Sequence, residues 1–170
     1  VTLLSTPLCI DPKGNEGLNP QKTEPTNPLY SLDKQQSSLV YYDKNTIVLT
    51  MPYWVKVTNS SVEDSEVKKH SFVLSYDPEA MTASDTKLKL YISHVVEDAG
   101  ETVTRSNFTY AYRAYSIRAA LAAFKEKTGK LPKYLELTAE INNSKDELVD
   151  KDGKETSVER SVEYDYAFTE

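Results

Sequence analysis

Only a few side chains in this sequence are of the types that attack substrates, relay protons or bind metal ions. The 170 residues include two histidines, His70 and His94, and one cysteine, Cys9. The histidines lie on separate predicted strands, so they approach each other only if those strands pair. A zinc site needs three or four ligands, and Cys9 is remote in sequence. We therefore interpret both histidines as hydrogen-bonded residues at the margin of the core, and we predict no metal and no cofactor.

The common catalytic motifs are absent from the sequence. It contains no G-x-S-x-G nucleophile elbow, no phosphate-binding loop, no G-x-G-x-x-G loop and no H-E-x-x-H helix. A glycosidase needs only two carboxylates, and the 26 Asp and Glu residues allow many pairs. Most of these acids, however, alternate with apolar residues or cluster in polar loops, as they do on solvated surfaces. We predict that the chain is not an enzyme, and we name no catalytic residue.

Tyrosine is unusually frequent, with 12 residues in the chain. Tyr110, Tyr112 and Tyr115 lie together just before a predicted helix. Tyrosine often packs on a sheet with its ring buried and its hydroxyl in water, and such packing alone explains the cluster. If exposed, the same rings form a platform for a glycan, a peptide or a partner protein. We take these three tyrosines as the candidate binding surface, and the exposure of their rings decides between the two interpretations.

Alternation of apolar and polar residues predicts the strands that carry these side chains. The run through Leu88, Leu90 and Ile92 is typical of an antiparallel strand with one buried face. Pro52 removes a ladder hydrogen bond, so we expect a sheet edge, a bulge or a break there. We expect the last strand to pair with the one before it. The predicted strands are 39–42, 46–58, 67–76, 86–95, 107–114, 133–142 and 158–168.

One segment interrupts the strand pattern and predicts a short helix. Apolar residues recur at helical spacing from Ile117 to Phe124. Ser116 can cap the start of this helix through its hydroxyl, and Gly129 is expected to end it in the left-handed conformation. We expect the helix to cross between two strands of a sandwich. The fold class that follows is all-β, an antiparallel immunoglobulin-like β-sandwich with one short α-helix.

Composition divides the chain and restricts its partners. Residues 1–37 are predicted to form an N-terminal strand followed by a linker rich in proline and asparagine, and residues 38–170 the sandwich. The 20 Lys and Arg against 26 Asp and Glu give a net charge of −6, which disfavours nucleic acid as a partner. No apolar run reaches the roughly 20 residues of a membrane span. Because the chain opens at Val1, we expect that any export signal has already been removed.

Several apolar and aromatic segments together resemble a known family. These are Met51–Trp54, His70–Tyr76, Lys87–His94, the helix from Ile117 to Phe124, and Glu163–Tyr166. Residues 39–168 resemble the C-terminal β-sandwich domain of NigD-like proteins, which are cell-envelope lipoproteins of Bacteroides-type bacteria. The resemblance implies an OB-like barrel before the sandwich, of which residues 1–10 would be the last strand, and a lipid anchor outside this sequence. It implies no catalytic residues.

The expected function follows from the resemblance and from the missing chemistry. We expect a noncatalytic, exported module of an envelope lipoprotein that binds another envelope protein or a glycan, through a sheet edge or an aromatic face. One alternative is a fimbrial or adhesin subunit whose strand in residues 1–10 pairs with a neighbour's sheet. Another is a glycan-active hydrolase on the same scaffold. The expected location is the cell envelope, either periplasmic or anchored to the outer membrane.

Overall fold

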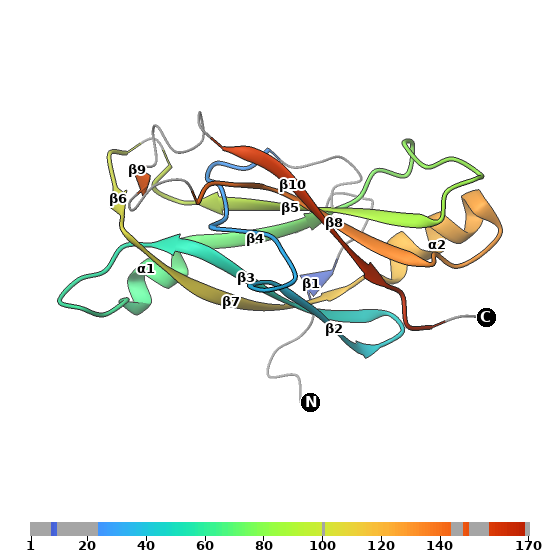
Figure 1. The fold of residues 1–170 in the computed structure, drawn as a ribbon, viewed down its shortest axis with the longest axis horizontal. Helices are drawn as coiled ribbons and strands as arrows, with labels where there is room; N and C mark the ends of the chain where they lie inside the picture. The colour runs from blue at the N-terminus through green and yellow to red at the C-terminus, as the bar shows by residue number, and fades with distance from the viewer. Residues whose placement is uncertain (1–7, 10–23, 100, 144–147, 150–156, 169–170) are drawn as a thin grey trace.

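The computed structural model describes residues 8–9, 24–99, 101–143, 148–149 and 157–168. Two four-stranded sheets are stacked on each other, and a helix lies near each end of the stack (Figure 1). The predicted all-β sandwich is therefore confirmed. It carries a second, very short helix that the sequence did not predict.

The first sheet has the strand order β1-β7-β3-β2, and the second has the order β10-β8-β5-β4. The strands of the first sheet are β1 (Leu8–Cys9), β2 (Ser38–Asp43), β3 (Thr46–Val55) and β7 (Asn107–Ser116). Those of the second sheet are β4 (His70–Ser75), β5 (Lys87–Val96), β8 (Tyr134–Ile141) and β10 (Val158–Asp165). A small ladder joins β6 (Thr104–Arg105) and β9 (Leu148–Val149), and the helices are α1 (Asp64–Lys68) and α2 (Arg118–Thr128).

Strand directions differ from the expectation at two places. The predicted pairing of the last two long strands is confirmed, because β10 runs antiparallel to β8 from Val158↔Ile141 to Asp165↔Tyr134. By contrast, β5 pairs with β8 in parallel, and β1 pairs with β7 in parallel. Parallel neighbours need a long crossover connection. Between β5 and β8 the chain visits the first sheet as β7 and returns through α2, and this path supplies the crossover.

Pro52 lies on β3 at a position where the N–H group that proline lacks is not needed for the hydrogen bonds to β7. β3 pairs with β7 along its whole length, whereas β2 reaches only as far as Thr50. The carbonyl of Pro52 accepts a hydrogen bond from Tyr30 N–H at 3.0 Å. Because the N and C=O of one strand residue point to the same side, the proline nitrogen faces away from the β7 ladder. The position is a local edge, as the sequence predicts.

The core lies between the two sheets and contains the inward side chains that the alternation identified. Leu88, Leu90 and Ile92 of β5 are buried, whereas Lys89 between them is exposed. On β3 the inward positions from Ile47 to Val55 are buried in the same way. Burial of these side chains is the main source of stability, because the hydrophobic effect scales with the apolar area removed from water.

α1 replaces the start of a predicted strand. The strand expected at 67–76 begins only at His70, because Val67 and Lys68 belong to the helix. The carbonyl of Glu63 accepts hydrogen bonds from the N–H groups of Glu66 and Val67, and these bonds close the single turn. Acidic residues in this first turn also suit the positive end of the helix dipole.

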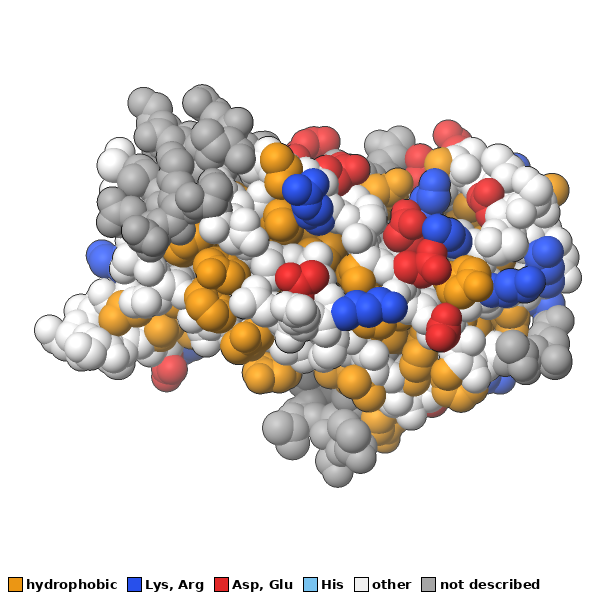
Figure 2. Space-filling model, in the orientation of Figure 1, with side chains coloured by type: hydrophobic (Ala, Val, Ile, Leu, Met, Phe, Trp, Pro, Cys, Tyr) orange, Lys and Arg blue, Asp and Glu red, His pale blue; other side chains and the backbone are white. Residues whose placement is uncertain are grey.

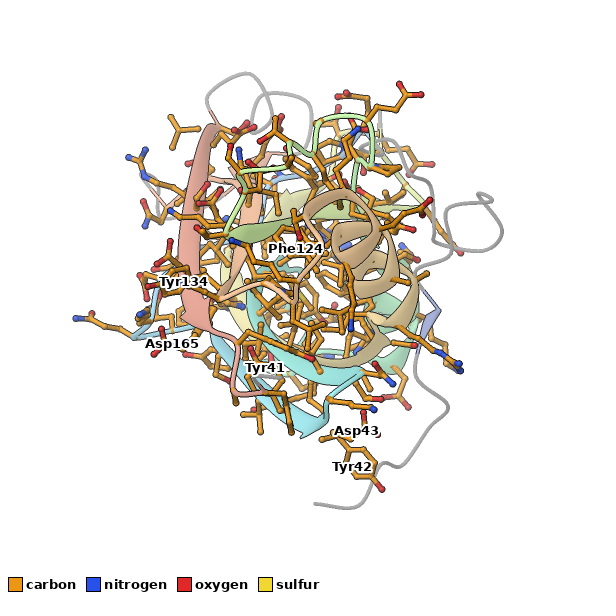
Figure 3. The ribbon with its side chains drawn as sticks, turned by 90° about the vertical axis from the view of Figure 1, so that its right-hand side faces the viewer. Tyr41, Tyr42, Asp43, Phe124, Tyr134 and Asp165 are labelled. Carbon is orange, nitrogen blue, oxygen red and sulfur yellow. The ribbon has the colours of Figure 1, made fainter. Side chains whose placement is uncertain are left out.

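α2 connects the two sheets at one end of the sandwich, which faces the viewer in Figure 3. It buries Ala120, Leu121 and Phe124. Ser116 does not cap it, because that residue is the last of β7, and the N-cap is Ile117, which makes no side-chain cap bond. Gly129 ends the helix as predicted, with φ +76°, and its N–H donates to Lys125 O at 2.8 Å.

The described part of the predicted linker is built into the sandwich. Leu29 N–H donates to Glu140 O of the second sheet, and Tyr30 N–H donates to Pro52 O of the first. Leu29 is fully buried. The folded domain therefore begins before the predicted boundary at residue 38. β1, the described part of the strand expected in residues 1–10, pairs with β7 in the first sheet of the sandwich. Residues 1–7 and 10–23 of the predicted strand and linker lie outside the described residues.

Candidate functional site

β7 presents two of the three predicted tyrosines to solvent. Tyr110 is 39% exposed and Tyr112 is 67% exposed, and Phe108 points to the same side with 40% exposed. Tyr115, the third residue of the predicted binding surface, does not lie on it. Only 1% of Tyr115 is exposed, and its hydroxyl donates to Phe72 O at 2.7 Å in the core. Positions of different parity on a strand face opposite sides of the sheet. Burial raises the pKa of the Tyr115 hydroxyl and keeps it protonated.

Further aromatic side chains extend this surface beyond the predicted residues. The Tyr30 ring stacks on Phe108 with ring centroids 4.2 Å apart, and it meets Trp54 edge-on at 5.1 Å. Trp54 itself is anchored, since its Nε1–H donates to Asn142 O at 2.7 Å. Phe108 was detectable from the sequence, because it shares the alternation of Tyr110 and Tyr112. Tyr30 was not, because it lies in the segment that reads as a linker.

Neighbouring strands continue the same surface without charge. The register places Val40, Val48 and Ala114 in one row across β2, β3 and β7. Apart from Asp43, which pairs with Thr46 at the end of β2, the outward positions on these three strands carry no Asp, Glu, Lys or Arg. Hydrophobic side chains gather along the edge of the molecule where these strands lie (Figure 2). We call this surface the outer face, and its exposed and half-buried side chains are Tyr30, Val40, Val48, Phe108, Tyr110, Tyr112 and Ala114. Pro52 and Trp54 lie on the same side of the sheet but are buried.

The two histidines meet inside the sandwich. Pairing of β4 with β5 brings His70 Nδ1 within 2.8 Å of His94 Nε2. His70 Nε2 lies 2.7 Å from Glu66 Oε1, and His94 Nδ1 lies 3.1 Å from Pro28 O. Both rings are buried, and the Phe72 ring stacks on His94. The prediction that both histidines are hydrogen-bonded residues of the core is therefore confirmed.

Buried charges continue this chain of contacts. Arg105 is fully buried, and it donates from Nε to Glu66 Oε1 at 2.8 Å and from Nη2 to Asp98 Oδ1 at 2.9 Å. Lys69 Nζ pairs with Asp98 from the surface at 3.0 Å. Burial opposes ionisation of both carboxyl groups, but hydrogen bonds from their basic partners outweigh it and lower the pKa of Glu66 and of Asp98. We call Glu66, His70, His94, Asp98 and Arg105 the buried polar cluster.

The contacts determine where the protons of the cluster lie. Pro28 O can only accept, so His94 carries its proton on Nδ1. Burial, and then the neighbouring charge of His70, lower the pKa of His94 to about 3, so the ring is neutral and its Nε2 accepts from His70 Nδ1–H. Burial lowers the pKa of His70 against the pull of Glu66. The contact between His70 Nε2 and Glu66 Oε1 needs one more proton, which belongs to this pair rather than to either residue.

The geometry of the buried polar cluster suits a structural role rather than metal binding. Glu66 comes from α1, His70 from β4, His94 from β5 and Arg105 from β6, so the cluster ties four elements together. A metal ion cannot sit between imidazole nitrogens that are 2.8 Å apart, since each Zn–N bond needs about 2.0 Å. Within the described ranges no three His, Cys, Asp or Glu side chains are placed to hold a metal ion. The side chain of Cys9 lies outside the described residues.

Sequence reasoning found the two histidines of the cluster but missed their partners. The spacing of Glu66 and His70 by four residues was an available signal for a local ion pair. Asp98 and Arg105 gave no such signal, because their partners are brought to them only by the folding of β6 against the end of the second sheet.

Comparison with known proteins relates the fold of this chain to that of a solved structure. No family model matches the chain, and no curated protein matches it. The crystal structure of a candidate lipoprotein from Bacteroides fragilis superposes with a TM-score of 0.73 and is 27% identical in sequence. The alignment covers 96% of this chain and 72% of the other. The chain has the fold of a Bacteroides candidate lipoprotein. Among the described residues neither helix is long and apolar enough to cross a bilayer.

Proposed function

We propose that this chain is a noncatalytic, exported module of a NigD-like envelope lipoprotein, and that its outer face binds another protein of the envelope. The similarity to a candidate lipoprotein of Bacteroides fragilis supports the lipoprotein assignment and a location in the envelope. The observation that supports binding is the outer face itself, because Tyr112 is 67% exposed on the same side of β7 as the exposed rings of Phe108 and Tyr110. The lipid anchor would lie outside the sequence described here.

The composition of the outer face favours a protein partner over a glycan. Protein interfaces are depleted of charge at their centre and enriched in tyrosine, tryptophan and phenylalanine. Exposed apolar patches on soluble proteins often mark such interfaces. The outer face adds the aliphatic side chains of Val40 and Val48 to its rings, and these offer no hydrogen bonds to sugar hydroxyls. A flat apolar surface of a partner protein matches both components.

The buried polar cluster supports a role without catalysis. His70 and His94 are the residues best suited to general acid and base chemistry, and both point into the core. Their ring nitrogens contact each other, Glu66 and Pro28 O, all within the protein. β1 pairs with β7 of its own chain, so the described strand pairing does not favour the fimbrial alternative.

Site-specific crosslinking tests the proposal. A photoreactive phenylalanine in place of Tyr112 is expected to crosslink one envelope protein in the native host, and the same group in place of the exposed Arg160 on β10 is not. With the captured partner purified, the double variant Tyr110→Ser and Tyr112→Ser should bind at least tenfold more weakly, since central tyrosines are frequent hot spots. The control Tyr134→Ser, on the second sheet, should bind normally.

Three outcomes contradict the proposal. Equal crosslinking from positions 112 and 160 would mean that the outer face has no special partner. Unchanged affinity of the double tyrosine variant would place the contact elsewhere on the molecule. Binding of a neutral glycan on an array, if lost in the same variant, would assign the outer face to a glycan instead.

A further inference from the structure

A groove with a volume of about 570 Å³ lies at the end of the sandwich that faces the viewer in Figure 3. Its walls are α2, the turn between β2 and β3, and the segment that follows β10. This volume is within the range of pockets that hold small molecules. We call it the α2 groove, and the residues that characterise it are Lys44, Arg118, Leu121, Lys125, Leu131 and Phe168.

Its apolar part is held in place by the fold. The Phe168 ring packs against Tyr41 and Tyr166, with ring centroids 5.5 and 5.7 Å away. Tyr166 is fixed in turn, because its hydroxyl donates to Lys44 O at 2.8 Å and its N–H donates to Lys133 O at 2.8 Å. The aromatic wall is therefore ordered before any ligand arrives, and binding requires little rearrangement.

Its polar part is basic. Arg118 and Lys125 are seven residues apart on one face of α2, which separates them by about 10 Å along the helix axis. Lys44 lies on the opposite wall. None of the described residues that line the groove is acidic, although the chain as a whole has a net charge of −6. The groove thus combines an apolar wall with three cationic side chains.

We propose that the α2 groove binds a linear acyl chain that ends in an anion, with a long-chain carboxylate as the simplest example. The hydrocarbon would lie along Leu121, Leu131 and Phe168, and the anion would pair with the cations. A peptide would bring backbone N–H and C=O groups, and among the described residues that line the groove Asn45 is the single side-chain amide. Polar groups buried without partners cost free energy, whereas a hydrocarbon chain has none to satisfy.

Calorimetric titration of the intact protein with decanoate, below the concentration at which it forms micelles, tests this proposal. Each buried methylene contributes about fourfold in affinity, so hexanoate should bind at least tenfold more weakly. The double variant Lys44→Gln and Arg118→Gln should lose at least fivefold, and added salt should weaken binding of the unaltered protein. The control Arg160→Gln removes an exposed cation on β10 and should bind decanoate normally.

The controls also define what would overturn the proposal. Decyl maltoside has a comparable chain and no charge, and equal binding of this compound would remove the role of the cations. Unchanged affinity of the double variant, in protein whose thermal unfolding is also unchanged, would place the ligand elsewhere. No heat of binding with decanoate, or preferential binding of a glutamate-rich peptide, would reject the acyl chain itself.

Discussion

Arg105 is the residue on which the buried polar cluster depends most. It is fully buried and contacts both carboxylates of the cluster, Glu66 and Asp98. Removing one partner of a buried ion pair leaves the other charge without compensation in a medium of low dielectric constant. Arg105 therefore contributes to stability mainly by compensating the buried negative charges of Glu66 and Asp98.

Replacing Arg105 should destabilise the protein severely. We expect Arg105→Leu to lower the free energy of unfolding by about 3–5 kcal/mol, because Glu66 and Asp98 both lose the buried guanidinium between them and keep only His70 and Lys69 as partners. Urea denaturation measures this loss directly. The matched change Arg160→Leu, at an exposed position on β10, should cost less than about 0.5 kcal/mol. A loss below about 1 kcal/mol for Arg105→Leu would mean that the carboxyl groups find other partners or bind protons.

The buried histidines should make stability depend on pH in a defined direction. The pKa of His94 is lowered to about 3 in the folded protein and is ordinary, near 6.5, in the unfolded chain. Below pH 6.5 the unfolded state therefore binds more protons, and stability is lost as the pH falls. Between pH 6 and pH 5 we expect a loss of roughly 1 kcal/mol from His94.

Urea denaturation at several pH values between 5 and 6 measures this slope, in a window above the ordinary pKa values of Asp and Glu. The variant His94→Gln has no proton to gain at this position, so its slope should be smaller by about one proton. A stability that does not change over this window would contradict the assignment of a neutral, buried His94.

At the scale of single elements, Gly129 shows how one residue ends a helix. Its φ of +76° is strained for any residue with a Cβ atom, and a Cβ built there meets nothing within 4 Å. The cost of a substitution is therefore a backbone cost, free of steric clashes with neighbours. Gly129 also turns the chain toward Leu131 in the α2 groove.

Substitution of Gly129 should accordingly follow backbone preference. We expect Gly129→Ala to lower the free energy of unfolding by about 1–2 kcal/mol, and Gly129→Asn by less, since asparagine tolerates the left-handed conformation. Thermal or urea denaturation of both variants compares them. Equal losses for alanine and asparagine would show that side-chain contacts, rather than the backbone, decide the cost.

Elements that depend on local pattern were predictable, and elements that depend on distant partners were not. Alternation identified the long strands, their buried faces and the stop at Gly129, because each depends on adjacent residues. The same rule of alternation separates Tyr115 from Tyr110 and Tyr112, although the three are close in sequence. The parallel pairing of β5 with β8 leaves no local trace, since it depends on the path of the chain through the other sheet.

At the scale of the whole molecule, location is the property that can be tested most simply. If the protein is an exported envelope module, the product of its natural gene should appear in the envelope fraction of the native host. It should also become sensitive to added protease once the outer membrane is opened. A cytosolic protein of known location provides the control for lysis. Recovery of the protein with the cytosolic control would contradict export, and with it the proposed partner.

The N-terminal segment has a mechanical consequence for the sandwich. Leu29 exchanges hydrogen bonds with the second sheet, from its own N–H to Glu140 O and from Asn142 N–H to its own carbonyl, while Tyr30 N–H is bound to the first sheet at Pro52 O. The dipeptide Leu29–Tyr30 is thus hydrogen-bonded to both layers. A pulling force that slides one layer over the other must break either its one bond to the first sheet or its two bonds to the second. The hydrogen bonds of Trp54 and Tyr115 between the layers add to this resistance to shear.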